Sequence, residues 1–126
     1  MPLHWKIGPS VIWIRIEGYA AYGLRETIAQ VIASPLYKPN QSLLLDRTGA
    51  TDTPSSDELR MRAREIRNLS LYQCAILVGA KPQDLQFGRL LREFLKSEGI
   101  GSEVFTDAAE AKRWLSSEEE KHAKTV

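Results

Sequence analysis

Polar residues that could do chemistry gather in one short stretch, where an apolar run gives way to an expected helix start. The apolar run at 42–45 ends in Asp46-Arg47-Thr48-Gly49, and Pro54-Ser55-Ser56-Asp57-Glu58 follows shortly after. In open α/β folds, polar groups at the junction between a parallel strand and a helix commonly form a working surface. The stretch therefore predicts a candidate surface without naming a reaction.

Asp46, at the end of an expected strand, raises the question of aspartyl-phosphate chemistry. That chemistry needs further carboxylates to hold magnesium beside the phosphate. The early strand supplies only Glu17 at its end, and Arg47-Thr48 stand where a phosphatase motif would have its second aspartate. We therefore expect no enzyme activity, and we expect Asp46 to accept hydrogen bonds from loop N–H groups and to pair with Arg47 or a nearby helix.

Metal and cofactor sites have no support in the sequence. His4 and His122 lie at opposite ends of the chain, and Cys74 lies in an apolar run, so no ligand cluster or nucleophile–base pair is predicted. The stretch 79–82 lacks the glycines and the Lys-Ser/Thr ending of a phosphate-binding loop. We therefore expect neither a metal nor a cofactor.

Composition narrows the class of protein. A chain of 126 residues with 43% hydrophobic content fits one domain, and a formal net charge of +1 argues against nucleic-acid binding. The single cysteine excludes an internal disulfide and gives no support for an extracellular scaffold. No apolar run approaches the roughly 20 residues of a transmembrane helix, and the N-terminus lacks a signal-peptide pattern. These features predict a cytoplasmic protein without a transmembrane segment.

Hydrophobic periodicity predicts one α/β domain over 1–117, followed by a polar tail at 118–126 that is a solvated helix extension or disordered. The expected strands are 3–7, 11–17, 42–46, 74–78 and 102–105, and the expected helices are 20–33, 56–69, 83–98 and one that starts near Asp107. The order ββαβαβαβα predicts an N-terminal hairpin followed by right-handed crossovers, which build a mainly parallel sheet.

The helix expected near 56–69 has a defined start and two different sides. Ser55 is the expected N-cap, with Glu58 as its reciprocal partner in a capping box. Its apolar side contains Leu59, Ala63 and Ile66, whereas Arg60, Arg64 and Arg67 share another side and Arg62 lies apart. Such a charged side is either solvated, with pairs such as Glu58–Arg62, or a docking surface for an acidic partner.

Two tryptophans alternate with polar residues on the first two expected strands. Trp5 and Trp13 either cover the core or lie on a sheet face that helices leave open. An exposed pair would predict self-association as a homodimer, or a hydrophobic ligand.

Four segments together resemble a STAS domain, the fold of bacterial anti-sigma-factor antagonists and of the cytoplasmic tails of sulfate transporters. They are residues 11–18, 43–49, 74–78 and 103–115. The small stand-alone SpoIIAA-like bacterial proteins are the most similar group, and the resemblance covers about residues 3–115. It implies an α/β fold with the helices packed mostly on one face of the sheet.

The resemblance also implies an equivalent of the serine that kinases phosphorylate in the antagonists. Their helix starts with Asp-Ser-Ser-Gly, and Pro54-Ser55-Ser56-Asp57 has the same spacing, so Ser56 is the equivalent position. Proline replaces the aspartate and aspartate replaces the glycine. A phosphate at Ser56 would meet the like charges of Asp57 and Glu58.

The sequence thus predicts a non-enzymatic, STAS-like protein-interaction or regulatory module of bacterial cytoplasm with an unidentified protein partner. The predicted partner-binding surface consists of Asp46, Arg47, Thr48, Ser55, Ser56, Arg60, Arg64 and Arg67. The alternative is a binder of a small hydrophobic or anionic ligand, in a pocket between the sheet and the helices at 20–33 and 83–98. An apolar cavity of about 300 Å³ or more would favour the binder, and a closed core would favour the module.

Overall fold

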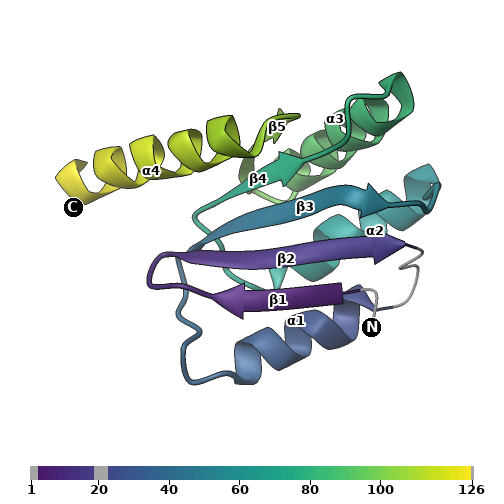
Figure 1. Ribbon diagram of the computed structural model, residues 1–126. Helices are drawn as coiled ribbons and strands as arrows, with labels where there is room; N and C mark the ends of the chain where they lie inside the picture. The colour runs from purple at the N-terminus through teal and green to yellow at the C-terminus, as the bar shows by residue number, and fades with distance from the viewer. Residues whose placement is uncertain (1–2, 19–22, 126) are drawn as a thin grey trace.

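The structure is a computed structural model that describes the backbone of residues 3–18 and 23–125, and their side chains as far as Ser117. Within these residues, one mixed sheet has the strand order β1-β2-β3-β4-β5 (Figure 1). β1 pairs antiparallel with β2, and the other neighbours are parallel, which confirms the predicted hairpin and mainly parallel sheet. The strands are β1 (Leu3–Ile7), β2 (Val11–Gly18), β3 (Ser42–Ala50), β4 (Gln73–Leu77) and β5 (Gly101–Phe105).

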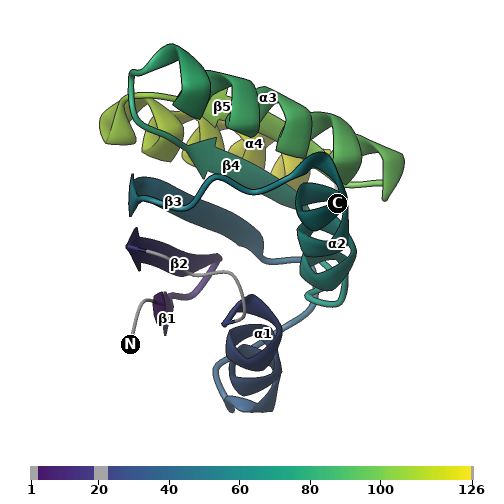
Figure 2. The ribbon, with the colours of Figure 1, turned by 90° about the vertical axis from the view of Figure 1, so that its right-hand side faces the viewer.

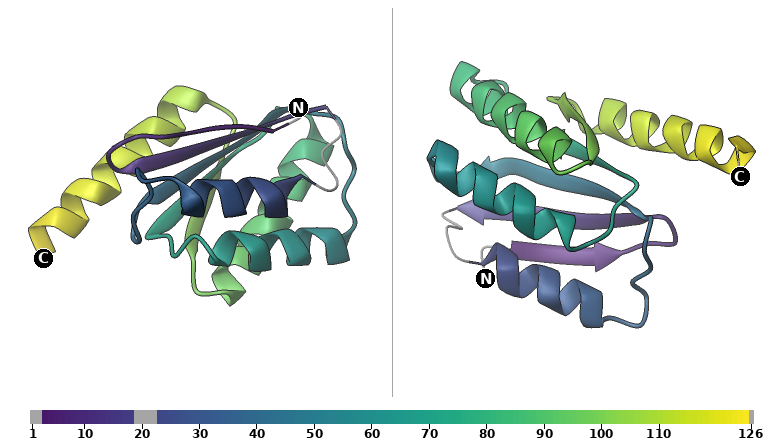
Figure 3. Two further views of the ribbon diagram at one scale, coloured as in Figure 1. Left: turned by 90° about the horizontal axis from the view of Figure 1, so that it is seen from below. Right: turned by 180° about the vertical axis from the view of Figure 1, so that it is seen from behind.

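The helices of the described chain cover the two faces of the sheet unequally. They are α1 (Leu24–Ala33), α2 (Ser56–Arg67), α3 (Pro82–Ser97) and α4 (Ala108–Thr125). α1, α2 and α3 lie together on one face, and α4 lies on the other (Figure 3). This follows from the strand order, because successive crossovers of one hand that each advance by one strand must place their helices on the same side. Figure 2 shows α1 and α2 along the same side of β1, β2 and β3.

Three helix ends can be compared with the sequence pattern. Residues 20–22, where the first helix was expected to begin, lie outside the described residues. The predicted polar tail continues the backbone of α4 as far as Thr125. α3 ends before Gly99, whose φ of +82° is a conformation that glycine adopts without strain.

The larger core fills the space between the sheet and α1, α2 and α3. Ile12, Ile14 and Ile16 point into it, as their alternation predicts, and each is at most 2% exposed. α3 approaches the sheet closely at Gly88, where an added Cβ would lie 2.9 Å from Val104 Cγ1. At this position α3 therefore packs directly on the apolar side chains of the sheet.

The second, smaller core explains why β4 is apolar along its whole length. Cys74 and Ile76 face the larger core, whereas Ala75 and Leu77 face α4, which rests on them through Ala111 and Leu115. α4 contacts β4 and β5 and packs with Leu44 of β3, so among the described elements the open half of this face consists of β1, β2 and the end of β3 that carries Asp46.

The predicted start of the last helix is confirmed, because Asp107 Oδ1 accepts a hydrogen bond of 3.0 Å from the N–H of Ala109. Among the described residues, no helix combines the length and the apolar character that a bilayer crossing requires.

Candidate functional site

The predicted partner surface is divided by the strand that carries its first residues. β3 runs to Ala50, beyond the expected end at 46, because it continues to pair with β2 through Glu17–Gly49 and Gly18–Ala50. Successive residues of a strand point to opposite faces, so Asp46 and Thr48 face the open half of the sheet while Arg47 is buried on the α2 side. The predicted partner surface from Asp46 to Arg67 is therefore not one continuous surface, because Arg47 is buried.

Asp46 makes the local hydrogen bonds that the sequence predicts but not the predicted ion pair. Its Oδ1 accepts bonds from the N–H and the hydroxyl of Thr48, at 2.9 and 2.6 Å. Arg47 pairs with Asp52 instead, because alternation along β3 directs the two side chains to different sides. Asp46 and Thr48 thus form a small Asx turn at the edge of the open half.

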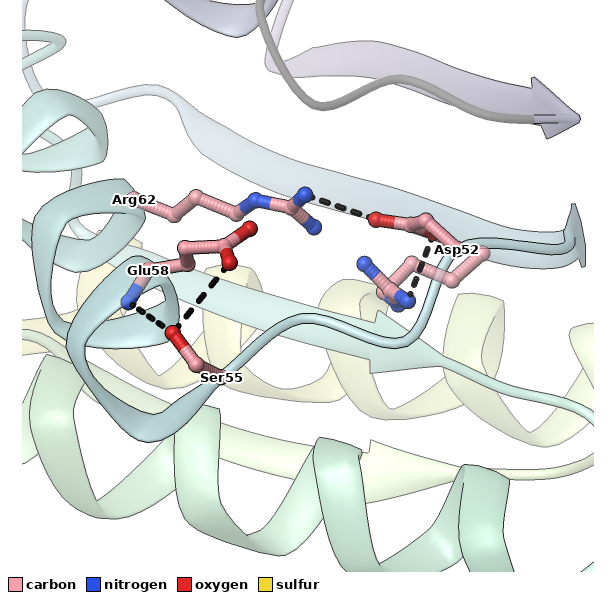
Figure 4. Close-up of polar contacts among 5 residues, drawn as sticks. Asp52, Ser55, Glu58 and Arg62 are labelled. Atoms are coloured by element: carbon pink, nitrogen blue, oxygen red, sulfur yellow. Dashed lines mark hydrogen bonds and ion pairs between the residues drawn. The ribbon is translucent and has the colours of Figure 1, made fainter.

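A buried charged cluster occupies the end of β3 that was expected to be a working surface. Asp52 accepts a hydrogen bond from Arg47 through Oδ1 at 3.2 Å and one from Arg62 through Oδ2 at 2.6 Å (Figure 4). The three residues are at most 7% exposed. The Nη1 atoms of both arginines are buried without a hydrogen-bond partner. The cluster therefore holds two positive charges against one negative charge.

Burial is the main influence on the electrostatics of this cluster. Desolvation lowers the pKa of Arg47, while the nearby Asp52 carboxylate acts in the opposite direction. Because a guanidinium titrates far above neutral pH, Arg47 remains charged, and Asp52 compensates its charge first and Asp84 more weakly.

The pairing of Arg62 corrects the predicted Glu58–Arg62 pair. Arg62 is three residues after Leu59 and so lies at the border of the apolar side of α2, from which it reaches Asp52. The Glu58 carboxylate instead contacts the Ser55 hydroxyl at 3.2 Å (Figure 4). The position of Arg62 beside Leu59 was the signal that could have indicated its burial.

The start of α2 confirms Ser55 as the cap, whereas the Glu58 carboxylate contacts the Ser55 hydroxyl and not the backbone N–H that a capping box would use. Ser55 is the N-cap residue, and its Oγ accepts a hydrogen bond of 3.2 Å from the N–H of Glu58. Ser56, the position equivalent to the phosphorylated serine, is the first residue of the helix and is exposed.

The three arginines on the other side of α2 are exposed but not free of contacts. Arg67 and Arg64 approach the Glu98 carboxylate at 2.9 and 3.7 Å. The Arg60 guanidinium lies 5.1 Å from the centre of the Phe94 ring. The arginine side of α2 therefore adjoins α3, and exposed Met61 lies next to it.

The two tryptophans lie on opposite faces of the sheet, so the predicted shared patch is wrong. Trp5 lies opposite Ile14, whose side chain points into the larger core. The indole Nε1 of Trp5 donates a hydrogen bond of 3.2 Å to Gln30 Oε1 on α1. Trp13 pairs with Lys6 and belongs to the smaller core on the α4 side. The hairpin register decides which face each ring occupies, because a register that differed by one residue would have placed Trp5 opposite Trp13 on the same face.

A groove of about 320 Å³ lies where the open half of the sheet meets α4. The strand register arranges its lining in two rows, Lys6–Trp13–Leu44 and His4–Arg15–Asp46. Lys112 of α4 closes the first row, and its Nζ lies 5.2 Å from the centre of the Trp13 ring. The Nζ of Lys6 approaches the same ring at 4.9 Å. Asp46, which was assigned to a partner surface, is thus part of this groove.

The thiol and the potential metal ligands do not add a reactive centre to the described part of the chain. Cys74 is fully buried, and burial raises its pKa to about 12. The neutral thiol is a poor nucleophile at physiological pH. Among the described side chains, residues 3–18 and 23–117, no cluster of three or more histidine, cysteine or acidic groups could hold a metal ion.

Comparisons with known proteins gave no match to family models, to curated proteins or to solved structures. The resemblance to STAS domains therefore depends on the residues and the order of elements described above.

Proposed function

We propose that this protein is a non-enzymatic, STAS-like interaction and regulatory module of the bacterial cytoplasm, and that the exposed side of α2 docks an acidic protein partner. The main support is Met61, which is 61% exposed, whereas Leu59, Ala63 and Ile66 on the opposite side are fully buried. The STAS resemblance adds support, because antagonists of that family present the corresponding helix to their kinases.

The charge around Met61 defines the partner's chemistry. Arg64 lies one turn after Met61, the exposed Asp57 and Glu58 lie one turn before it, and Arg60 precedes it in sequence. Glu98 is the carboxylate that already pairs with Arg64 and Arg67. A partner with an acidic rim and an apolar recess would bury the methionine and meet the arginines. Interfaces commonly combine a buried apolar anchor with a polar rim of this kind.

Site-specific photo-crosslinking in the native host tests this docking surface. A photoreactive residue at Met61 should capture a partner, whereas the same residue at Arg89, exposed on α3, serves as the matched control. The captured protein, once purified, should bind Met61→Asp at least about tenfold more weakly than it binds wild type. Equal crosslinking from positions 61 and 89, or unchanged affinity of Met61→Asp, would contradict the proposal.

The role of the arginines is tested with a single substitution. Glu98 is half-buried and would lose both of its ion-pair partners if Arg64 and Arg67 were replaced together. Arg60→Gln alone leaves these pairs intact, so the variant should remain folded. It should weaken the binding of an acidic partner, and the loss should be larger at low salt, where screening is weakest. Arg89→Gln is its control, and phosphoserine at Ser56 in protein from the native host would add kinase control to the proposed role.

A further inference from the structure

The groove on the open half of the sheet combines an aromatic and apolar floor with cationic walls. Half-buried Trp13 forms its floor, and Leu44, its neighbour across β2 and β3, supports this floor from the smaller core and is only 2% exposed. Lys6 comes from the edge strand β1 and Lys112 from α4, so elements far apart in the sequence bring two ammonium groups to one indole ring. This arrangement is independent of the α2 surface, which belongs to the opposite face of the sheet.

The two lysines differ from the other cations of the groove in their partners. Arg15 pairs with Glu17, and His4 Nε2 lies 3.5 Å from the same carboxylate. For Lys6 and Lys112, the described side chains provide no carboxylate within ion-pair distance. Their contacts with Trp13 are cation–π contacts, worth about 0.5–1 kcal/mol each at exposed sites. An incoming anion can therefore recruit both ammonium groups at low cost.

The single carboxylate of the lining is placed away from the lysines. Asp46 is in the second row, one step along the strands from Trp13 and Leu44, and its Oδ1 is held by Thr48. The groove is thus electrostatically polar, with its positive end at the Trp13 row and its acidic group at the Arg15 row. A ligand that carries one negative charge would bind in one orientation.

We propose that this groove binds a small planar organic anion, an aromatic carboxylate in its simplest form. The ring of the ligand packs on Trp13, and its carboxylate lies between the ammonium groups of Lys6 and Lys112. The volume of about 320 Å³ is at the lower end of the range for small-molecule sites, which suits a ligand of one or two fused rings.

Three isosteric probes test the proposal by calorimetry at low salt: naphthalene-2-carboxylate, the neutral 2-naphthamide and the cationic 2-naphthylmethylamine. The carboxylate should bind, the amide should bind at least about fivefold more weakly, and the cation should bind more weakly still. The indole N–H signal of Trp13 in ¹H–¹⁵N spectra should move with the carboxylate, whereas those of Trp5 and Trp114 should move less.

Variants with opposite expected signs separate this site from non-specific binding. Lys6→Gln and Lys112→Gln should each weaken carboxylate binding about fivefold, and Asp46→Asn should strengthen it. Lys96→Gln, at the exposed end of α3, is the matched control and should change nothing. Dispersed ¹H–¹⁵N spectra establish that each variant is folded.

Several results would overturn the proposal. They are equal affinities for the carboxylate and the amide, undiminished binding by both lysine variants, and no carboxylate binding at about 5 mM. Changes of the Trp13 signal that follow protein concentration instead of the probe would assign the groove to a second copy of the chain, and would overturn the proposal as well.

Discussion

Asp52 is the residue on which the buried cluster depends, because it accepts a hydrogen bond from each of the two arginines. Removing one partner of a buried ion pair costs about 3–5 kcal/mol when a charge is left uncompensated. In this cluster the consequence differs between the partners. Loss of Asp52 leaves Arg47 and Arg62 facing each other, whereas loss of Arg62 leaves the neutral pair of Arg47 and Asp52.

Asp52→Asn should therefore lower the free energy of unfolding by about 3–5 kcal/mol, and Arg62→Met should lower it by clearly less. Urea denaturation of both variants provides the measurement. If Arg62→Met proved the more destabilising variant, the excess positive charge of the cluster would not govern its energetics.

Cys74 gives the stability of the protein a dependence on alkaline pH. The ordinary thiol pKa is 9.0, and burial raises the pKa of Cys74 to about 12. Between these values the folded chain binds a proton that the unfolded chain has lost, so the free energy of unfolding should fall as the pH rises from about 9 to about 12. Denaturation across this range should show a smaller slope for Cys74→Ala than for wild type, and equal slopes would contradict this account.

At the scale of elements, the start of α2 allows a sharp comparison between adjacent serines. Ser55→Ala removes the acceptor for the N–H of Glu58 and should cost about 1 kcal/mol in the free energy of unfolding. Ser56→Ala, at an exposed first position of the helix, should be nearly neutral. Thermal or urea unfolding measures both free energies. A larger loss of stability for Ser56→Ala would contradict the assignment of Ser55 as the N-cap residue.

The sequence correctly predicted the features that depend only on residues close together in the chain. The alternation of Ile12, Ile14 and Ile16 identified β2 and its buried side, and the Ser55 cap located the start of α2. These features depend on pleat periodicity and on backbone N–H groups within one turn, both of which are visible in a short window.

The features that the sequence did not predict depend on contacts between segments that are far apart in the chain. β3 extends past Asp46 because β2 continues to pair with it through an irregular register between Arg15 and Glu17. That extension turns Arg47 inward, to meet Asp52. The groove could not be predicted, because its lining depends on both the register of the hairpin and the position of α4 on the sheet. Neither can be inferred from a short stretch of sequence.

At the scale of the whole molecule, the sequential strand order decides where a functional surface can lie. A sheet whose strand order never reverses has no topological switch point, where open α/β folds form their ligand crevices. Here the end of β3 is filled by the buried Arg47–Asp52–Arg62 cluster. The candidate surfaces are instead the outer side of α2 and the uncovered half of the opposite sheet face, so one binding event need not block the other.

The uncovered half of the sheet also sets the expected behaviour of the protein in self-association. Since Trp5 and Trp13 do not share a face, a homodimer through this side would have to use Trp13 together with Lys6, Arg15 and Lys112. A two-fold axis would bring these cations of the two copies together, and salt would weaken their repulsion. We therefore expect a monomer at low salt, with any dimer through this face strengthening as salt is added.

Sedimentation over a range of salt and protein concentrations measures this dependence. Trp13→Glu should abolish a dimer formed through the uncovered half, whereas Met61→Asp on the opposite side should leave it intact. Binding of an aromatic carboxylate should have the opposite salt dependence, because screening weakens an attraction between unlike charges. A dimer that is tightest at low salt, or that survives Trp13→Glu, would place self-association on another part of the molecule.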